Sequence, residues 1–152
     1  ENIVREIDKQ RLVDHASGWS DQSGGDYHSR HIYFTKIIFK KKKAKKRILA
    51  LTEFGGYSLP IGNHQYDENK VFGYRKFSSK QELEKAIEKL YLEIIKPQLA
   101  NGLQALVYTQ LSDVEEEING FLTYDRLVLK VDKSFMKRIN KDLSEYFNNM
   151  YN

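Results

Sequence analysis

The chain has 152 residues, 40% of them hydrophobic and 30% charged, which is the length and composition of one globular domain. No segment approaches the run of about 18 apolar residues that a membrane helix needs, so we expect no membrane partner. The sequence contains no cysteine, which excludes disulfides and thiolate chemistry. This composition fits a reducing compartment, and we expect a cytoplasmic location. Because the first residue is glutamate, we expect a piece of a longer protein.

The positive charge of the chain is local. The formal net charge is +4, yet residues 40–47 contain seven of the 25 lysines and arginines. Outside this run, acidic side chains outnumber basic ones. The run lies between two expected strands and has no interleaved aromatic residues, which is typical of a solvated loop. We therefore expect no nucleic-acid partner, and a basic nucleic-acid-binding domain is kept as an alternative.

The first half of the chain contains one helical segment and three strand-like segments. Residues 2–10 carry apolar side chains at helical spacing, and the later segments are rich in β-branched, aromatic or other apolar residues. We expect the tail of a helix at 2–10 and strands at 11–14, 27–34 and 48–52.

The second half begins with a polar loop at about 57–77. Ser79 and Glu82 then form a capping box, which opens a helix with apolar residues at helical spacing. We expect Pro97 and Gly102 to end that helix. The remaining expected elements are a strand at 103–111, a short hairpin near 121–131, and an amphipathic helix at about 134–147 with Ser134 as its N-cap.

These elements together predict an α/β fold. The four expected strands alternate with helical or loop connections, which favours a parallel sheet covered by helices. The strands at 48–52 and 103–109 are almost continuously apolar, as buried parallel strands are.

Polar side chains gather where the expected strands end. They are Asp14 with His15, His31 with Tyr33, Thr52 with Glu53, and Gln110 through Asp113. In α/β folds the carboxyl ends of parallel strands form the functional edge of the sheet. Glu53 directly follows an apolar run, where a carboxylate is costly unless it is paired or used. Gly55 and Gly56 then allow a sharp turn and leave room for a ligand.

Alternatives stay open at several of these positions. Glu53 can equally be a strand-end carboxylate that pairs with a neighbouring cation. His28 and His31 lie three residues apart, so on one strand they face opposite sides, and we expect no metal site. Trp19 can stack on a ligand ring or anchor its own loop.

Four segments, in this order, resemble a known enzyme family. They are Arg11–Trp19 (RLVDHASGW), the strand that ends in His31-Ile32-Tyr33, Leu51–Gly56 (LTEFGG) and Val107–Val114 (VYTQLSDV). Together they resemble the C-terminal half of the catalytic barrel of glycoside hydrolase family 2, which includes β-galactosidases, β-glucuronidases and β-mannosidases. The resemblance covers about residues 5–132, and its most specific element is the Thr-Glu-Phe-Gly motif.

The resemblance implies a (β/α)8 TIM barrel, of which this chain, as a single partial domain over 1–152, supplies strands five to eight. It implies that Glu53 is the catalytic nucleophile and that Tyr33 hydrogen-bonds it. His31 and Tyr108 stand where other members carry an asparagine and a tryptophan, which puts the sugar preference in doubt. The expected substrate-binding residues are His31, Tyr33, Trp19, Tyr108, Gln110 and Asp113, with no metal or organic cofactor.

A retaining glycosidase also needs a second carboxyl group about 5 Å from the nucleophile. In this family that group follows an asparagine at the end of strand four, upstream of residue 1. A complete barrel takes about 250 residues, so the chain is roughly half of one. We therefore expect a fragment that hydrolyses little alone and pairs with the upstream half of the barrel or with a second copy. The alternative is a non-catalytic carbohydrate-binding or scaffold module.

Overall fold

A computed structural model describes residues 1–15 and 18–151, and the chain divides into two compact units. The first unit contains Glu1–Phe54 and Gln98–Val107. The second contains Gly55–Pro97 and the chain from Tyr108 onward. The structure combines helices with a small parallel sheet, and the TIM barrel itself stays a prediction.

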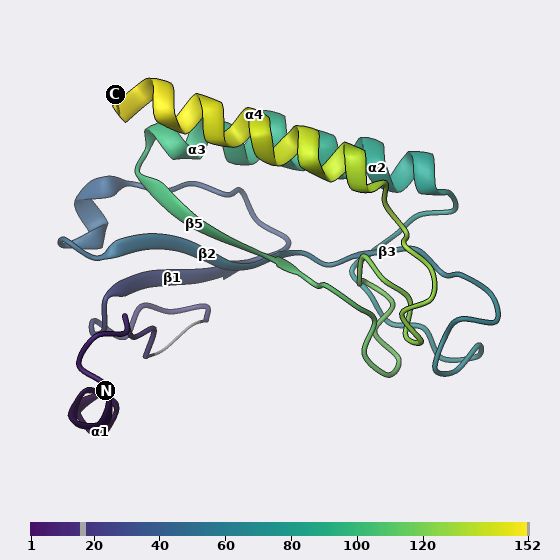
Figure 1. Cartoon of the computed structure of the whole chain (residues 1–152), viewed down its shortest axis with the longest axis horizontal. Helices are drawn as coiled ribbons and strands as arrows, with labels where there is room; N and C mark the ends of the chain where they lie inside the picture. Colours follow the sequence, from purple (N-terminus) through teal and green to yellow (C-terminus); the bar gives the residue numbers. More distant parts are fainter. Residues whose placement is uncertain (16–17, 152) are drawn as a thin grey trace. The chain divides into compact units, whose positions relative to one another are not determined.

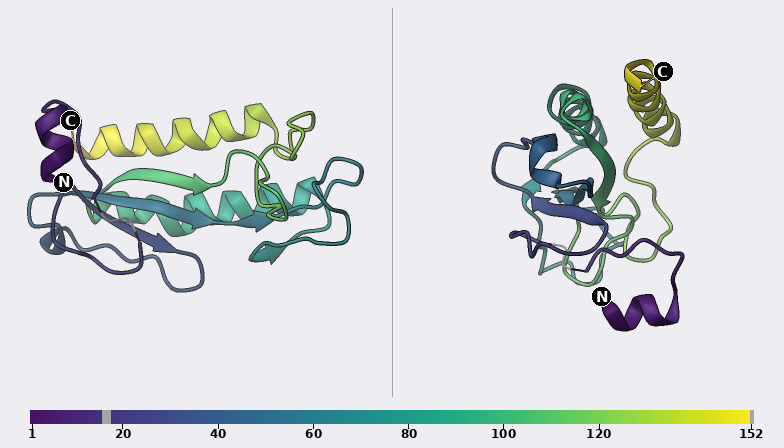
Figure 2. Two further views of the ribbon diagram at one scale, coloured as in Figure 1. Left: turned by 90° about the horizontal axis from the view of Figure 1, so that it is seen from below. Right: turned by 90° about the vertical axis from the view of Figure 1, so that its left-hand side faces the viewer.

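The first unit is built on a three-stranded sheet. Its strands are β1 (Tyr27–Ile32), β2 (Ile48–Gly55) and β5 (Leu103–Thr109), in the order β1-β2-β5. The three arrows point the same way in Figure 1 and in the left-hand view of Figure 2. The central strand β2 is buried along most of its length, because its apolar side chains Leu49, Leu51 and Phe54 lie in the core. β1 and β2 are parallel, and a register shift between Arg30 and His31 places His31 opposite Glu53.

The expected strand at 11–14 is wrong, because these residues are irregular in the structure. The Val13 amide donates to the side chain of Asp26, and the Asp26 amide donates to the Val13 carbonyl. The Asp26 carboxylate thus accepts the backbone hydrogen bond that the carbonyl of a neighbouring strand would otherwise accept. The N-terminal helix α1 (Asn2–Ile7) and the strands β1 and β5 each end earlier than their expected ranges. A short 3-10 turn, η1 (Lys41–Ala44), precedes β2.

The second unit contains a long helical run and a C-terminal helix. The run begins with α2 (Lys80–Glu88) and the π-helical η2 (Lys89–Ile95) and ends in α3 (Lys96–Ala100), whose residues from Gln98 onward belong to the first unit. Helix α4 (Lys133–Tyr151) packs against η2 (Figure 1). The predicted cap is confirmed, because Ser79 Oγ accepts a hydrogen bond from the Glu82 amide. A short parallel pair, β3 (Tyr57–Ser58) with β4 (Arg75–Lys76), lies in the expected loop. No helix among residues 1–15 and 18–151 has both the length and the apolar character to cross a membrane.

In the second half of the chain, two sequence predictions about helix ends are wrong and one about a hairpin is confirmed. Pro97 does not end the helix; the helical run continues from η2 through Pro97 to Ala100, and Pro97 closely follows the π-helical turns, where the hydrogen-bond pattern departs from that of an α-helix. Ser134 is not an N-cap, because α4 begins at Lys133. The expected hairpin at 121–131 is present as a bridge between Leu122 and Leu129.

Candidate functional site

Glu53 lies near the end of β2, at the carboxyl edge of the sheet in the first unit. The parallel register puts it opposite His31 on β1. Its side chain is 44% exposed, although three of the preceding strand residues are buried. The strand therefore fixes the backbone of Glu53 and leaves the carboxylate at the surface.

Two neighbouring side chains hold one oxygen of this carboxylate. Tyr33 Oη donates to Glu53 Oε2 at 2.9 Å, and His31 Nδ1 lies 3.2 Å from the same oxygen. The hydrogen bond expected between Tyr33 and Glu53 is therefore present. Within the part of the chain that the structure describes, no hydrogen bond reaches Oε1 of Glu53. Among the described residues, the carboxylate is thus held through Oε2 alone.

Two aromatic rings lie beside Tyr33, the residue that donates to this carboxylate. Trp19 is 66% exposed, and its ring centroid lies 6.3 Å from that of Tyr33. The ring centroid of Phe34 also lies 6.3 Å from that of Tyr33, and Phe34 is largely exposed as well. Apolar ring faces at a surface are suited to stacking on the C–H faces of a sugar.

Tyr108, expected beneath the sugar, belongs to the second unit. Its ring stacks on Phe121, with centroids 4.3 Å apart and planes 14° from parallel. It also lies against Gly55, where an added Cβ would come within 2.2 Å of the ring. Gly55 has a φ of +87°, so glycine is needed there for both conformation and space. The room that we expected the two glycines to leave for a ligand is filled by Tyr108 at Gly55.

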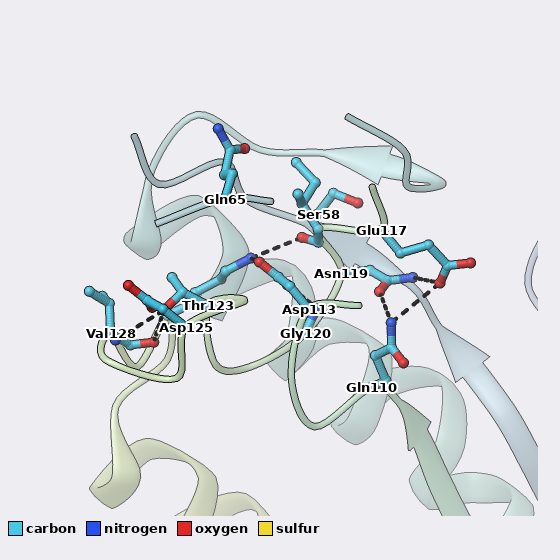
Figure 3. Close-up of polar contacts among 12 residues, drawn as sticks. Ser58, Gln65, Gln110, Asp113, Glu117, Asn119, Gly120, Thr123, Asp125 and Val128 are labelled. Carbon is cyan, nitrogen blue, oxygen red and sulfur yellow. Dashed lines mark hydrogen bonds and ion pairs between the residues drawn. The ribbon is translucent and has the colours of Figure 1, made fainter. Parts of the chain in front are cut away.

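Gln110 is part of a small polar network in the second unit. Its side-chain amide donates to Asn119 Oδ1 at 2.7 Å and to Glu117 Oε2 at 3.3 Å (Figure 3). The backbone N–H of Gln110 also donates a hydrogen bond to the backbone carbonyl of Asn119. These contacts fix the loop around Gln110. Its contact with sugar stays a prediction.

Asp113 is fully buried and paired with Lys130. The ammonium lies 2.8 and 2.6 Å from the two carboxylate oxygens, and it donates further to the Ile118 carbonyl. Oδ1 of Asp113 also accepts the Gly120 amide (Figure 3). Burial raises the pKa of Asp113 and lowers that of Lys130, while their mutual hydrogen bonds oppose both shifts. This environment favours a structural role for Asp113, and its contact with sugar stays a prediction.

Sequence reasoning missed Lys130. A lysine is almost never fully buried unless it is paired, and this one is 1% exposed. The local sequence carries no signal for this burial, because Lys130 lies between the apolar residues Leu129 and Val131, and alternation in a hairpin would place it on the outer face.

The structure brings four of the seven predicted site residues together. Glu53, Tyr33, His31 and Trp19 form one cluster in the first unit, and we refer to it as the Glu53 cluster. The other three predicted residues, Tyr108, Gln110 and Asp113, belong to the second unit. Among the described residues, no group of three or more histidine, aspartate or glutamate side chains is placed to hold a metal ion.

No protein-family model matches this chain, and comparison with curated proteins finds no match either. The chemistry of the Glu53 cluster is therefore the basis for a functional proposal.

Proposed function

We propose that this chain is part of a retaining glycoside hydrolase that cleaves terminal β-linked sugars, with Glu53 as its nucleophile. The observation that supports the proposal is the asymmetry of the Glu53 carboxylate, with Oε2 held by Tyr33 and His31 and Oε1 open. A nucleophile must keep its attacking oxygen in a fixed direction without losing access to substrate. An ordinary strand-end ion pair with lysine or arginine would instead occupy the carboxylate.

The reaction proceeds in two displacements. Glu53 Oε1 attacks the anomeric carbon, and the bond from that carbon to the leaving oxygen breaks as the second carboxyl group donates a proton to this oxygen. The resulting glycosyl ester is then cleaved by water, which gives its proton back to the same group. Tyr33 stabilises the Glu53 carboxylate when it is released, and Trp19 offers a ring face to the sugar.

The second carboxyl group belongs, in this proposal, to an upstream segment that supplies the other half of a TIM barrel. Among the described residues, β1 and β5 are the edge strands of this sheet, and edge strands can pair with additional strands. The chain alone then hydrolyses little, and either the upstream half or a second copy covers the edges. The cysteine-free sequence is consistent with a cytoplasmic setting.

The test uses the protein with its upstream barrel half and a panel of aryl β-glycosides. Glu53→Gln should lower kcat by about 10⁴-fold or more, as loss of a nucleophile does elsewhere. An activated 2-fluoro glycoside, which stalls the glycosyl ester, should label the peptide that contains Glu53. Glu145→Gln, an exposed change on α4, is the matched control. Full activity of Glu53→Gln, or a label on another peptide, would overturn the proposal.

The second candidate is a carbohydrate-binding module without catalysis. Trp19 and Phe34 favour it, because both rings are exposed beside Tyr33. This candidate predicts that the protein with its upstream segment hydrolyses no glycoside. It also predicts that Glu53→Gln does not change its affinity for sugar.

A further inference from the structure

A second pocket adjoins the Glu53 cluster within the first unit. It has a volume of about 550 Å³. The seven residues that line it are Trp19, Asp21, His28, Arg30, Lys42, Lys43 and Lys45. Trp19 belongs to both the pocket and the Glu53 cluster, since its ring also lies beside Tyr33. We refer to this pocket as the lysine pocket.

The lysine pocket has an excess of uncompensated positive charge. Among the described residues, the side chains of Arg30, Lys42, Lys43 and Lys45 make no ion pair or hydrogen bond. The one carboxylate in the lining, Asp21, is already neutralised by Arg47 through contacts of 2.8 and 2.7 Å. That bidentate pair holds the pKa of Asp21 well below its usual range. Within residues 1–15 and 18–151, these four cations therefore line the pocket without a counter-ion.

The loop that carries these lysines is held in place at two points. Arg47 donates to the carbonyls of Gly24 and Tyr27 as well as to Asp21. His28, which is buried on β1, places Nδ1 3.2 Å from the Lys43 carbonyl. The backbone is thus fixed while the ammonium groups stay exposed, which reduces the entropy lost when a ligand binds.

The shape and charge of the pocket together indicate a ligand with two parts. The exposed indole of Trp19 suits the apolar face of a pyranose ring. The cations suit an anion whose oxygens point in several directions, because lysine ammonium groups are point charges without the planar geometry that matches a carboxylate. A sulfate or phosphate ester has this tetrahedral arrangement of oxygens.

We propose that the lysine pocket binds a saccharide that carries a sulfate or phosphate ester, with the sugar ring on Trp19 and the ester among Arg30, Lys42, Lys43 and Lys45. The inference rests on the proposed function, because it takes the ligand to be a sugar that continues from the Glu53 cluster. The ester belongs to a sugar unit away from the scissile bond, since the lysines precede β2 and Glu53 lies near its end.

A nucleic acid is the competing ligand, and the pocket favours it less. Proteins that bind single strands stack successive bases on several aromatic side chains along a basic groove. Trp19 is the one large aromatic residue among the seven that line this pocket. A single ring beside a compact group of cations fits one sugar with its ester better than a run of bases.

Trp19 is also the only tryptophan in the sequence, so intrinsic fluorescence reports on the pocket directly. The chain should be titrated with a sulfated disaccharide, its unsulfated parent, the corresponding phosphate ester, a uronic-acid disaccharide, inorganic sulfate and a ten-nucleotide oligothymidine. We expect the sulfated or phosphorylated sugar to bind at least tenfold more tightly than the parent. The stronger of these two identifies the source of the ester. Binding should weaken as salt increases.

Charge variants test the assignment of the residues. Replacing Lys42, Lys43 and Lys45 together by glutamine should weaken binding of the ester at least tenfold. Replacing the α4 lysines Lys133, Lys137 and Lys141 by glutamine removes the same charge and should leave binding unchanged. Circular dichroism and melting of both variants check that they fold. Trp19→Phe should weaken the binding of every sugar and leave the binding of inorganic sulfate unchanged, as measured by calorimetry.

The outcomes separate this inference from the proposed function. Equal binding of ester and parent, tighter binding of the uronic acid or the oligonucleotide, or equal losses in the two triple variants would overturn it. If the protein with its upstream barrel half hydrolyses glycosides but does not prefer the ester, the inference about the lysine pocket fails and the glycosidase proposal stands. Ester binding without any hydrolysis would remove the glycosidase proposal and leave a binding site.

Discussion

Glu53 and Asp113 are two carboxylates with opposite environments. Glu53 is 44% exposed, with one oxygen held by neutral or weakly basic groups and the other open. Asp113 is 1% exposed, and Lys130 contacts both of its oxygens. Both residues follow apolar segments, and both were expected at a sugar site. Their surroundings in the structure assign them different tasks.

The difference teaches that exposure and partner type decide whether a carboxylate keeps an oxygen that no cation holds. A fully buried charge needs a counter-ion to offset its desolvation, and such a pair has no free oxygen for substrate. A half-exposed carboxylate is solvated and needs only orientation. The contrast predicts that variants around Asp113 affect stability, whereas variants around Glu53 affect chemistry.

The largest effect should follow from Lys130→Met. Removing the ammonium leaves the Asp113 carboxylate buried without a counter-ion, so we expect a loss of about 3–5 kcal/mol in the free energy of unfolding. Urea unfolding followed by circular dichroism measures the loss. Lys80→Met, which breaks an exposed pair with Asp132, is the control and should cost about 0–1 kcal/mol.

A double replacement sharpens the same point. Asp113→Leu combined with Lys130→Met removes both charges and should recover much of the stability lost in Lys130→Met. If Lys130→Met costs no more than Lys80→Met, the contrast between the two carboxylates fails.

Gly55→Ala should have the next largest effect. The new Cβ would overlap the Tyr108 ring, and the φ of +87° disfavours any residue but glycine. We expect a loss of about 1–3 kcal/mol in the free energy of unfolding, seen as a lower Tm. Gly62→Ala is a matched control, since its Cβ would meet nothing within 4 Å. Equal Tm values for the two variants would show that Tyr108 does not pack on Gly55.

Tyr33→Phe should affect stability little. It removes one half-buried hydrogen bond to Glu53, so the expected cost is about 1 kcal/mol or less. In the protein extended with the upstream half of the barrel, the same change should lower kcat about tenfold or more, because the nucleophile loses its orientation. Unfolding curves and steady-state kinetics on one preparation provide both values. A stability loss as large as that of Lys130→Met would reverse the assignment.

The smallest expected effect is the change with pH in the contribution of Asp125 to stability. Hydrogen bonds from Thr123, His64 and the Leu127 amide lower the pKa of Asp125 to about 2. Because the folded-state pKa lies below the ordinary value of about 4, the contribution to stability is complete above pH 4 and disappears as pH falls toward 2. Asp125→Asn should therefore melt at a lower temperature than the unmodified chain at pH 6, and the difference should shrink at pH 2.5. An unchanged difference would mean that Asp125 is not held in this way.

Local sequence patterns determined a large part of the secondary structure. The capping box at Ser79, the apolar runs of β2 and β5, and the amphipathic repeat of α4 are set by neighbours along the chain, so periodicity and capping chemistry identify them. The Thr-Glu-Phe-Gly motif led to the hypothesis that Glu53 is a nucleophile, which stays a prediction. Segment ends were less certain, because the helix continues through Pro97 and the segment at 11–14 gives its amide to a carboxylate.

Only tertiary structure decided which polar residues meet. The contact of Tyr33 and His31 with one oxygen of Glu53 depends on the register shift between β1 and β2, and the burial of Lys130 depends on how the hairpin folds over Asp113. The grouping of Trp19 with three lysines depends on Arg47, which holds the loop to Asp21. Each of these contacts joins residues 12 or more apart in the sequence, where periodicity along the chain carries no information about distance in space.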